Sequence, residues 1–210
     1  MRFISRIDNP MDAFHMAESV FNLIWCTEKA EEFIIDNIKN LMVNYQSGMK
    51  SGWCYENAMF LHLLLNSYNR PSYLYNYGIK NTRLTHAIVI VEFEGEYYPI
   101  DPYFCRCFTD GSNILTIKQL LEKIKLRDFD SITTLYGTGF KKVYSNNQTT
   151  EFTGKNFTDQ VMNDWVDNFD YNNIMVREFG HTNPLELMTR KIEKVRILRK
   201  WSGELYYEFF

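Results

Sequence analysis

Residues 52–65 read Gly-Trp-Cys-Tyr-Glu-Asn-Ala-Met-Phe-Leu-His-Leu-Leu-Leu, and this stretch decides the fold. From the cysteine onward it contains neither glycine nor proline and leaves almost no polar face. A helix that is apolar nearly all round is buried in the centre of a domain. Residues 46–52 precede it as a loop in which Gly48 and Gly52 interrupt regular structure. The pattern therefore predicts a central, buried helix that begins at Cys54.

Alternating side chains after this helix predict an antiparallel sheet. Tyrosine occupies every second position over residues 73–77, which is the period of a strand. Residues 86–93 and 96 to about 103 predict two more strands, joined by a turn at residues 94–95. Pro99 cannot donate to a strand ladder, so we expect a bulge there or a position that faces away from a partner. Helices first and an antiparallel sheet after them indicate the α+β class.

Three further helices are predicted from capping signals and helical spacing. Asn9, followed by a proline, is typical of an N-cap and a first helical residue. A second helix is expected to begin near Thr27. Thr116 and Gln119 form a capping-box pattern for a helix that runs to residue 126.

The C-terminal part of the chain is predicted to be mixed. Residues 145–156 are polar and indicate a loop, whereas residues 161–169 carry apolar side chains at helical spacing. Asn183, followed by a proline, is expected to open another helix, and residues 195–207 predict a terminal hairpin. Because no linker rich in Pro, Gly or Ser interrupts the sequence, we expect a single domain over residues 1–210.

The composition of the 210 residues is that of a folded globular chain, with 45% hydrophobic, 16% aromatic and 23% charged residues. Lys and Arg number 23 against 26 Asp and Glu, which gives a net charge of −3. Since phosphate binding needs a clear basic excess, nucleic acid is not expected as a partner. The longest apolar run, residues 87–91, is far too short to cross a bilayer, and no signal-peptide pattern is visible. We therefore expect a cytoplasmic protein without a membrane span.

The four cysteines are expected to be reduced thiols, because a chain of this length with so few cysteines is not a disulfide scaffold. They are Cys26, Cys54, Cys105 and Cys107. The last two flank Arg106, but no paired Cys or His spacing completes the four ligands that zinc needs. No metal site is therefore expected.

Cys54 is the residue that the sequence best suits to a nucleophile. A glycine-containing loop delivers it to the first turn of the buried helix. Free backbone N–H groups and the positive end of the helix dipole favour a thiolate there. The same N–H groups can stabilise an oxyanion beside the sulfur. A small core cysteine is the alternative explanation for this position taken alone.

His86 and Asp101 are predicted to meet on neighbouring strands. If the turn at residues 94–95 closes a two-residue hairpin, His86 lies opposite Tyr103. Asp101 is then one diagonal step away on the same face, where a carboxylate can reach the imidazole. Together with Cys54, these residues would supply a thiol, a base and an orienting acid. Taken singly, a core histidine and a turn carboxylate would explain the same two positions.

These residues resemble the transglutaminase-like superfamily over about residues 46–104. That family typically shows a Gly-x-Cys-x-x-x-Ala pattern, a leucine-rich helix, a histidine strand and an Asp-Pro strand. The matching segments are Gly52-Trp53-Cys54-Tyr55-Glu56-Asn57-Ala58, Leu64-Leu65, Arg70-Pro71-Ser72-Tyr73, Thr85-His86-Ala87-Ile88-Val89-Ile90-Val91, Gly95-Glu96-Tyr97 and Ile100-Asp101-Pro102. The chain departs from the family at Asn69-Arg70, where Gly-Ile is frequent, and at Tyr97, where Trp is usual.

The resemblance implies a papain-like fold, in which a nucleophile helix packs on an antiparallel sheet that carries His and Asp. N-terminal helices would precede this core, and a helix and hairpin extension would follow it. The resemblance implies Cys54 as nucleophile, His86 as general base and acid, and Asp101 as the group that orients His86, without a cofactor. Papain-like enzymes also use an upstream glutamine as oxyanion donor. Gln46 is the only upstream glutamine here, although an ordinary loop residue explains it as well. Trp53 would either wall the acyl pocket or pack in the core.

The sequence therefore predicts an enzyme that transfers an acyl group through a covalent intermediate on Cys54. The donor is a peptide, another amide or a thioester. The acceptor stays open between water, as in a hydrolase or thiol protease, and an amine, as in a transferase.

Two other functions compete with this prediction. Arylamine N-acetyltransferases share the Cys, His, Asp order and a Gly-x-Cys-x-Glu fragment, although Ala58 stands where they have Asn. An N-acyltransferase that takes its acyl group from CoA or an acyl-carrier protein is therefore one alternative. A non-catalytic binding module on the same fold is the other.

Overall fold

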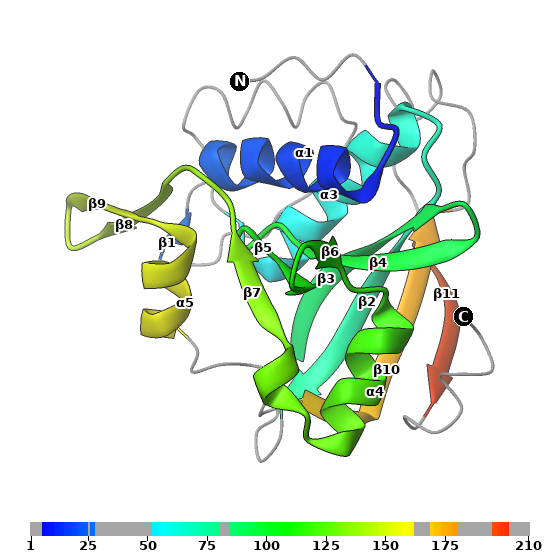
Figure 1. Ribbon diagram of the computed structural model, residues 1–210. Helices are drawn as coiled ribbons and strands as arrows, with labels where there is room; N and C mark the ends of the chain where they lie inside the picture. Colours follow the sequence, from blue (N-terminus) through cyan, green and yellow to red (C-terminus); the bar gives the residue numbers. More distant parts are fainter. Residues whose placement is uncertain are drawn as a thin grey trace.

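The central helix predicted from the apolar run is α3 (Cys54–Ser67). Every residue of it from Asn57 to Leu65 is buried, because the helix packs against both α1 (Pro10–Leu23) and the main sheet (Figure 1). The computed structural model describes residues 6–24, 26–27, 52–79, 85–161, 169–179 and 195–201. Within them, no helix is long and apolar enough to span a membrane.

The main sheet has the strand order β11-β10-β2-β3-β4-β5-β6, and β7 pairs with β5 outside this path. All of its pairings are antiparallel, as the period-two pattern predicts. The strands are β2 (Ser72–Ile79), β3 (Thr85–Phe93), β4 (Glu96–Asp101), β5 (Arg106–Asp110), β6 (Asn113–Ile114), β7 (Thr133–Tyr136), β10 (Phe169–Phe179) and β11 (Val195–Trp201).

Helices cover both faces of this sheet. Side chains at odd positions of β3, such as Val89, join the core beneath α1 and α3. Those at even positions, such as Ile88 and Ile90, pack with α4 (Ile117–Leu126) on the other face. Figure 1 shows α1 and α3 on one side of the strands and α4 on the other. Helices packed on an antiparallel sheet confirm the predicted α+β class.

The predicted capping signals are confirmed in both helices where they can be examined. The Asn9 side chain accepts a hydrogen bond from the backbone N–H of Asp12, whose carboxylate accepts one from the N–H of Asn9. Thr116 and Gln119 make the same reciprocal pair at the start of α4. Each box satisfies backbone donors that have no partner inside the helix.

The β3–β4 hairpin has the predicted two-residue turn. Phe93 pairs with Glu96, and both turn residues have positive φ, +54° at Glu94 and +81° at Gly95, as a type I′ turn requires. The ladder runs through Pro99 without a register shift, so the bulge considered for this position does not form. The strand ends at Asp101 instead of near residue 103, because residues 102–105 turn back towards β5.

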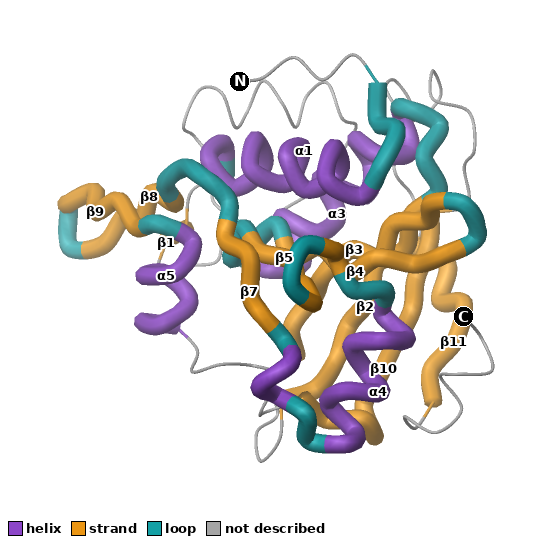
Figure 2. Tube along the Cα trace, viewed as in Figure 1, coloured by secondary structure: helices purple, strands orange, loops and turns teal. Residues whose placement is uncertain are grey.

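The loop predicted over residues 145–156 is wrong. A second, smaller sheet of β1 (Cys26–Thr27), β8 (Lys141–Ser145) and β9 (Gln148–Phe152) occupies this region, and α5 (Gly154–Val161) follows it (Figure 2). The strands are polar because they lie at the surface, so their composition resembles that of a loop. The available signal was Asn146-Asn147: both residues have positive φ and close the hairpin, as Asn does in type I′ turns.

The C-terminal strands belong to the main sheet. The helix predicted over residues 161–169 is wrong at Phe169, which opens β10; Val161 is the last described residue of α5, and residues 162–168 lie outside the described residues. β11 pairs with β10, which in turn pairs with β2. The helices predicted near Thr27 and at Asn183, and the second arm of the terminal hairpin, lie outside the described residues. A short 3-10 helix, η1 (Phe129–Ser131), links α4 to β7.

Replacing Leu61 by alanine tests whether α3 is the centre of the core. Leu61 has no exposed surface, so Leu61→Ala leaves a cavity and should lower the free energy of unfolding by about 2–5 kcal/mol. Leu126→Ala is the matched control, because Leu126 is 77% exposed and its loss should change the free energy by less than about 0.5 kcal/mol. Urea unfolding measures both; equal effects would contradict the central position of α3.

Candidate active site

His86 and Asp101 form a direct hydrogen bond inside the protein. Nε2 of His86 lies 2.8 Å from Oδ2 of Asp101, and both side chains are almost completely buried. His86 lies at the start of β3 and Asp101 at the end of β4, so the diagonal contact predicted from the hairpin register is confirmed. Because Nε2 faces the carboxylate, Nδ1 is the ring nitrogen that remains for another partner.

The Asp101 carboxylate is held by four donors. Oδ2 accepts from His86 and, at 3.1 Å, from Nε of Arg106. Oδ1 accepts from the backbone N–H groups of Tyr103 and Phe104 at 3.1 and 3.2 Å. Burial alone would raise the pKa of Asp101, but His86, Arg106 and the Phe104 N–H together lower it. Asp101 is therefore an ionised carboxylate at neutral pH.

Arg106 is the residue of this cluster that the sequence did not reveal. It is fully buried on β5, directly opposite Asp101 in the ladder, with its guanidinium 4.7 Å from the centre of the Phe104 ring. A basic residue one hairpin step after an Asp-Pro turn was the available signal. In the sequence, Cys105 and Cys107 on either side of Arg106 form a pattern that is typical of metal binding and gives no indication of a buried ion pair.

The surroundings of His86 favour its charged form. Three aromatic rings enclose the imidazole, with centroids 5.4 Å away for Tyr77, 6.0 Å for Tyr103 and 5.1 Å for Phe104. Burial opposes protonation, but the charge and hydrogen bond of Asp101, followed by those of Cys54, outweigh it and raise the pKa of His86 to about 9. At neutral pH the ring is therefore an imidazolium.

A second buried histidine shows the role of the carboxylate. His62 lies on α3 with its Nδ1 2.8 Å from the Ser72 hydroxyl. Burial lowers the pKa of His62 to about 3. Both histidines are buried, but the Asp101 carboxylate raises the pKa of His86, whereas burial dominates at His62.

Cys54 is the first residue of α3 and is half-buried. Its hydrogen bond and its charge both contribute to the raised pKa of His86, and Cys54 also packs against the cluster that contains Tyr103 and Phe104, two of the rings beside His86. Helix α3 packs on the face of the sheet that carries Val89, whereas Tyr77, the partner of His86 in the ladder, belongs to the cluster on the face with α4.

The other three thiols differ from Cys54 in their setting. Cys105 and Cys107 are buried, and burial raises the pKa of each thiol to about 12. Cys26 is half-buried, with its sulfur 3.6 Å from the Tyr103 hydroxyl. Among the residues that the structure describes, no group of three or more His, Cys, Asp or Glu side chains is arranged to hold a metal ion.

A family model described as a transglutaminase-like domain matches residues 14–124, which is more than half of the chain. The chain belongs to the transglutaminase-like domain family. The match covers α3, β2 to β6 and most of α1 and α4, and thus every element that carries Cys54, His86, Asp101 or Arg106. Neither a curated protein nor a solved structure gives a match.

The two remaining site predictions for this transglutaminase-like domain have different outcomes. Gln46 lies outside the described residues. Trp53 is the N-cap of α3, immediately before Cys54, and its side chain is 49% exposed. The alternative of a buried core tryptophan is therefore wrong. The backbone N–H of Trp53 donates to Oε2 of Glu56 at 2.8 Å, which secures the start of the helix.

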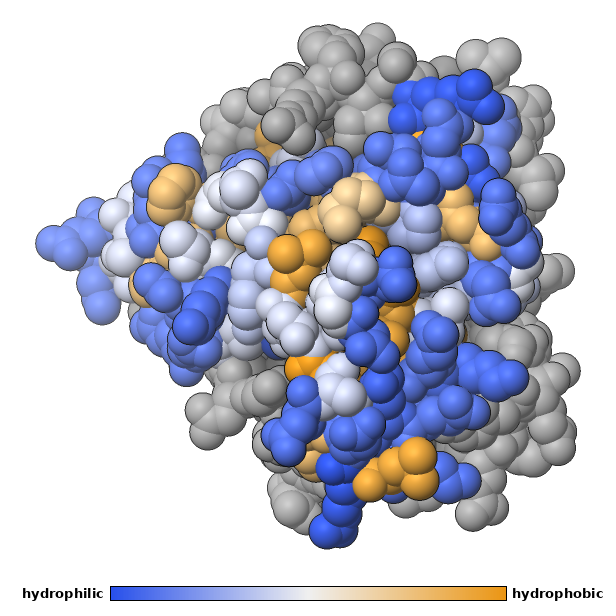
Figure 3. Space-filling model, in the orientation of Figure 1, coloured by the Kyte–Doolittle hydropathy of each residue, from blue (hydrophilic) through white to orange (hydrophobic). Residues whose placement is uncertain are grey.

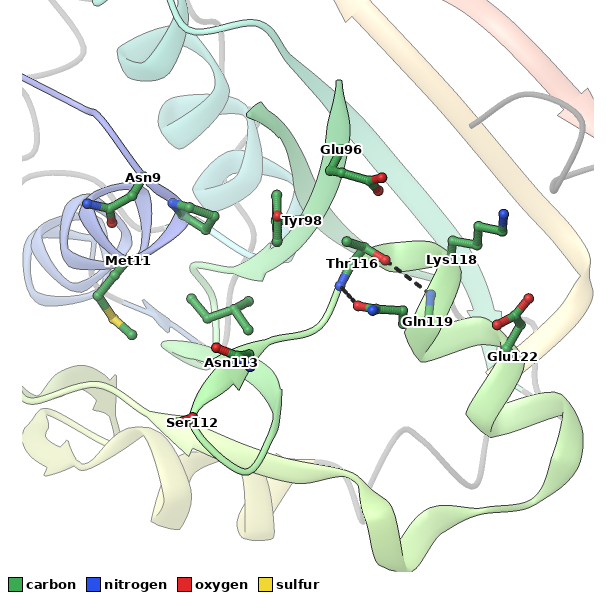
Figure 4. Close-up of a pocket in the computed structure, with 12 residues that line it drawn as sticks. Asn9, Met11, Glu96, Tyr98, Ser112, Asn113, Thr116, Lys118, Gln119 and Glu122 are labelled. Carbon is green, nitrogen blue, oxygen red and sulfur yellow. Dashed lines mark hydrogen bonds between the residues drawn. The ribbon is translucent and has the colours of Figure 1, made fainter. Parts of the chain in front are cut away.

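A groove of about 840 Å³ lies at the opposite end of β4 from Asp101. Asn9, Met11, Glu96, Tyr98 and Gln119 are among its lining residues (Figure 4). Apolar surface shows between α1 and β6 in this region of a mainly hydrophilic face (Figure 3). The described residues that line the groove include neither cysteine nor histidine, so this groove is separate from the chemistry of the transglutaminase-like site.

The pH dependence of stability tests the coupling of His86 to Asp101. The ordinary pKa of histidine is 6.5, and that of folded His86 is about 9. A pKa raised on folding contributes stability that is fully present below pH 6.5 and is lost as the pH rises through about 9. Asp101→Asn removes the carboxylate charge, so this variant should be less stable than the wild type at pH 6.5. It should also not show the loss of stability as the pH rises through about 9.

Urea unfolding of wild type and Asp101→Asn between pH 6 and 10 measures the effect. The other titrating groups are common to both proteins, so the difference between the two curves reports the pair. The difference in the free energy of unfolding between wild type and Asp101→Asn should become smaller as the pH rises through about 9. Parallel curves across this range would contradict the coupling.

Proposed function

We propose that this protein is a cysteine-dependent acyl-transfer enzyme that acts on an amide or a thioester through an acyl intermediate on Cys54. The observation that supports the proposal is the buried His86–Asp101 hydrogen bond, together with a Cys54 thiol close enough to contribute to the raised pKa of His86. A structural role could explain each of these three polar side chains separately, but it gives no reason for the three to occur together. Nucleophilic catalysis requires all three in one site. Membership of the transglutaminase-like family supports the same chemistry.

The proposed first half-reaction forms the acyl-enzyme. The Cys54 sulfur attacks the carbonyl carbon, and the carbonyl oxygen becomes an oxyanion that the backbone N–H of Cys54 stabilises. The bond to the leaving group then breaks, and His86 gives its proton to the departing amine or thiol. Asp101 keeps Nε2 engaged, so that Nδ1 faces the sulfur and the charged ring is stabilised.

The second half-reaction releases the acyl group. Water or an amine attacks the thioester carbon while His86 takes the proton of the nucleophile, and Cys54 leaves as the thiolate. Water makes the enzyme a hydrolase, such as a peptidase or amidase, and an amine makes it a transferase. The three proposed catalytic residues serve both outcomes equally.

The N-acyltransferase alternative loses part of its support. Its fragment is Cys54-Tyr55-Glu56, and the Glu56 carboxylate already caps α3 by accepting from the Trp53 N–H. This capping bond explains the glutamate without any donor such as CoA. A CoA or acyl-carrier thioester remains one chemical class of donor to test.

Mass spectrometry of the intact protein tests the proposal directly. Incubation with peptides, acyl-CoA or acyl-carrier thioesters should leave an acyl group on Cys54, located by peptide mapping. Adding an amine then separates the two outcomes, since a transferase yields the amide and a hydrolase yields the acid. If no donor acylates Cys54 and the thiol reacts slowly with alkylating reagents, a binding module is the better description.

Cys54→Ala should abolish acyl transfer while leaving the fold intact. Loss of the nucleophile should lower the rate by at least about 10³-fold. Removal of a half-buried thiol should change the free energy of unfolding by less than about 1 kcal/mol. Cys26→Ala is the matched control, because Cys26 is also half-buried but is not proposed to react, and it should keep wild-type activity.

The comparison uses iodoacetamide labelling at pH 7 together with turnover of whichever donor acylates the wild type. Wild type and Cys26→Ala should each take up one fast label, and Cys54→Ala none. Near-normal turnover by Cys54→Ala would refute Cys54 as the nucleophile.

A further inference from the structure

Lys141, the first residue of β8, is completely buried near the start of α3. Its Nζ donates to the backbone oxygen of Ile24 and to Oδ1 of Asn57, each at 3.0 Å. The same nitrogen lies 4.6 Å from the centre of the Phe21 ring. Burial lowers the pKa of Lys141 to about 7. An apolar side chain of similar length would avoid the cost of burying an ammonium group, so stability alone does not account for a lysine here.

Asn57 connects Lys141 to the residues that precede the nucleophile. It is buried one turn after Cys54, and side chains on a helix point back towards the N-terminus. Its Nδ2 donates to the backbone oxygen of Gly52 at 3.2 Å and to that of Trp53 at 2.7 Å. The Asn57 side-chain amide therefore accepts a hydrogen bond from Lys141 through its oxygen and donates to the carbonyls of Gly52 and Trp53 through its nitrogen.

The Trp53 carbonyl and the Cys54 N–H belong to one peptide group. That group is planar, and in the trans form the N–H points away from the C=O. A hydrogen bond that holds the carbonyl therefore also sets the direction of the Cys54 N–H. In the proposed reaction this N–H is the donor that stabilises the oxyanion.

The support behind Lys141 is itself anchored. In the segment before β8, the Thr138 N–H donates to Glu18 at 2.6 Å and the Phe140 N–H to Asn22 at 2.7 Å. Both acceptors lie on α1, which packs against α3. Lys141 thus reaches Asn57 from a segment that is tied to the same helical layer.

We propose that Lys141 is a positioning residue for acyl transfer, which holds the Trp53 carbonyl through Asn57 and so aims the Cys54 N–H at the oxyanion. This inference rests on the proposed function, and it adds a lysine and an asparagine that take no part in the proton transfers. It predicts a defect that is confined to reactions that pass through an oxyanion.

Two reagents separate this role from a general effect on Cys54. With p-nitrophenyl acetate, the sulfur bonds to the carbonyl carbon through an oxyanion, and the C–O bond breaks to release p-nitrophenolate. With iodoacetamide, the sulfur displaces iodide from a CH₂ carbon and no oxyanion forms. Lys141→Met should slow acetylation of Cys54 by about 10-fold or more, whereas alkylation should change less than about threefold.

Lys142→Met is the matched control. Lys142 is the next residue of β8, is half-buried, and lies 3.9 Å from Glu151, away from α3. Both reactions should be unchanged in this variant. Equal slowing of the two reactions in Lys141→Met, or no change in either, would overturn the positioning role.

Asn57→Ala provides a second variant in case Lys141→Met does not fold. It removes the connection to the loop and keeps the bond from Lys141 to Ile24, so it should show the same selective loss of acetylation. The double variant Asn57→Ala, Lys141→Met should acetylate Cys54 no more slowly than Asn57→Ala alone, because Lys141 acts on the Trp53 carbonyl only through Asn57. If neither variant folds, as circular dichroism would show, the two residues serve stability and the inference is withdrawn. A wild type that acquires no acetyl group on Cys54 would instead refute the proposed function itself.

Discussion

The Asp101 carboxylate is the interaction on which the rest of the site depends. A buried charge is tolerated only when it is paired and fully hydrogen-bonded, and four donors meet this requirement here. They come from β3 through His86, from β5 through Arg106, and from the turn that joins β4 to β5. One carboxylate therefore connects three neighbouring strands and their turn, and it orients His86 and favours the charged form of its ring.

The position of α3 follows from a second constraint, which is the burial of its apolar surface. A helix without a polar face must be covered by α1 on one side and the sheet on the other, so its axis is set by packing. Its first residue, Cys54, packs against the cluster that contains Tyr103 and Phe104, in the turn that follows Asp101. Cys54 is the first residue of α3, His86 the second of β3 and Asp101 the last of β4, so all three residues lie at the ends of their elements.

Polar groups around Cys54 are satisfied by contacts that are distant in the sequence. Asn57 bonds to the loop before Cys54 and to Lys141, which is 84 residues further along the chain. Glu18 and Asn22 on α1 secure the segment that delivers Lys141. The small sheet of β1, β8 and β9 thus contributes a hydrogen bond to the first turn of α3, although its strands lie at the edge of the molecule (Figure 2).

The sequence by itself determined the central helix, the β3–β4 hairpin and the meeting of His86 with Asp101, because these depend on local periodicity, a short turn and its register. Only the tertiary structure decided the burial of Arg106 and Lys141 with their partners, the pairing of β10 with β2 and the pairing of β8 with β1. Charged or polar residues give no periodic signal of burial, since such a side chain is stable inside only when distant partners satisfy it. Those partners come together only when the chain folds, so the spacing of residues along the sequence does not predict them.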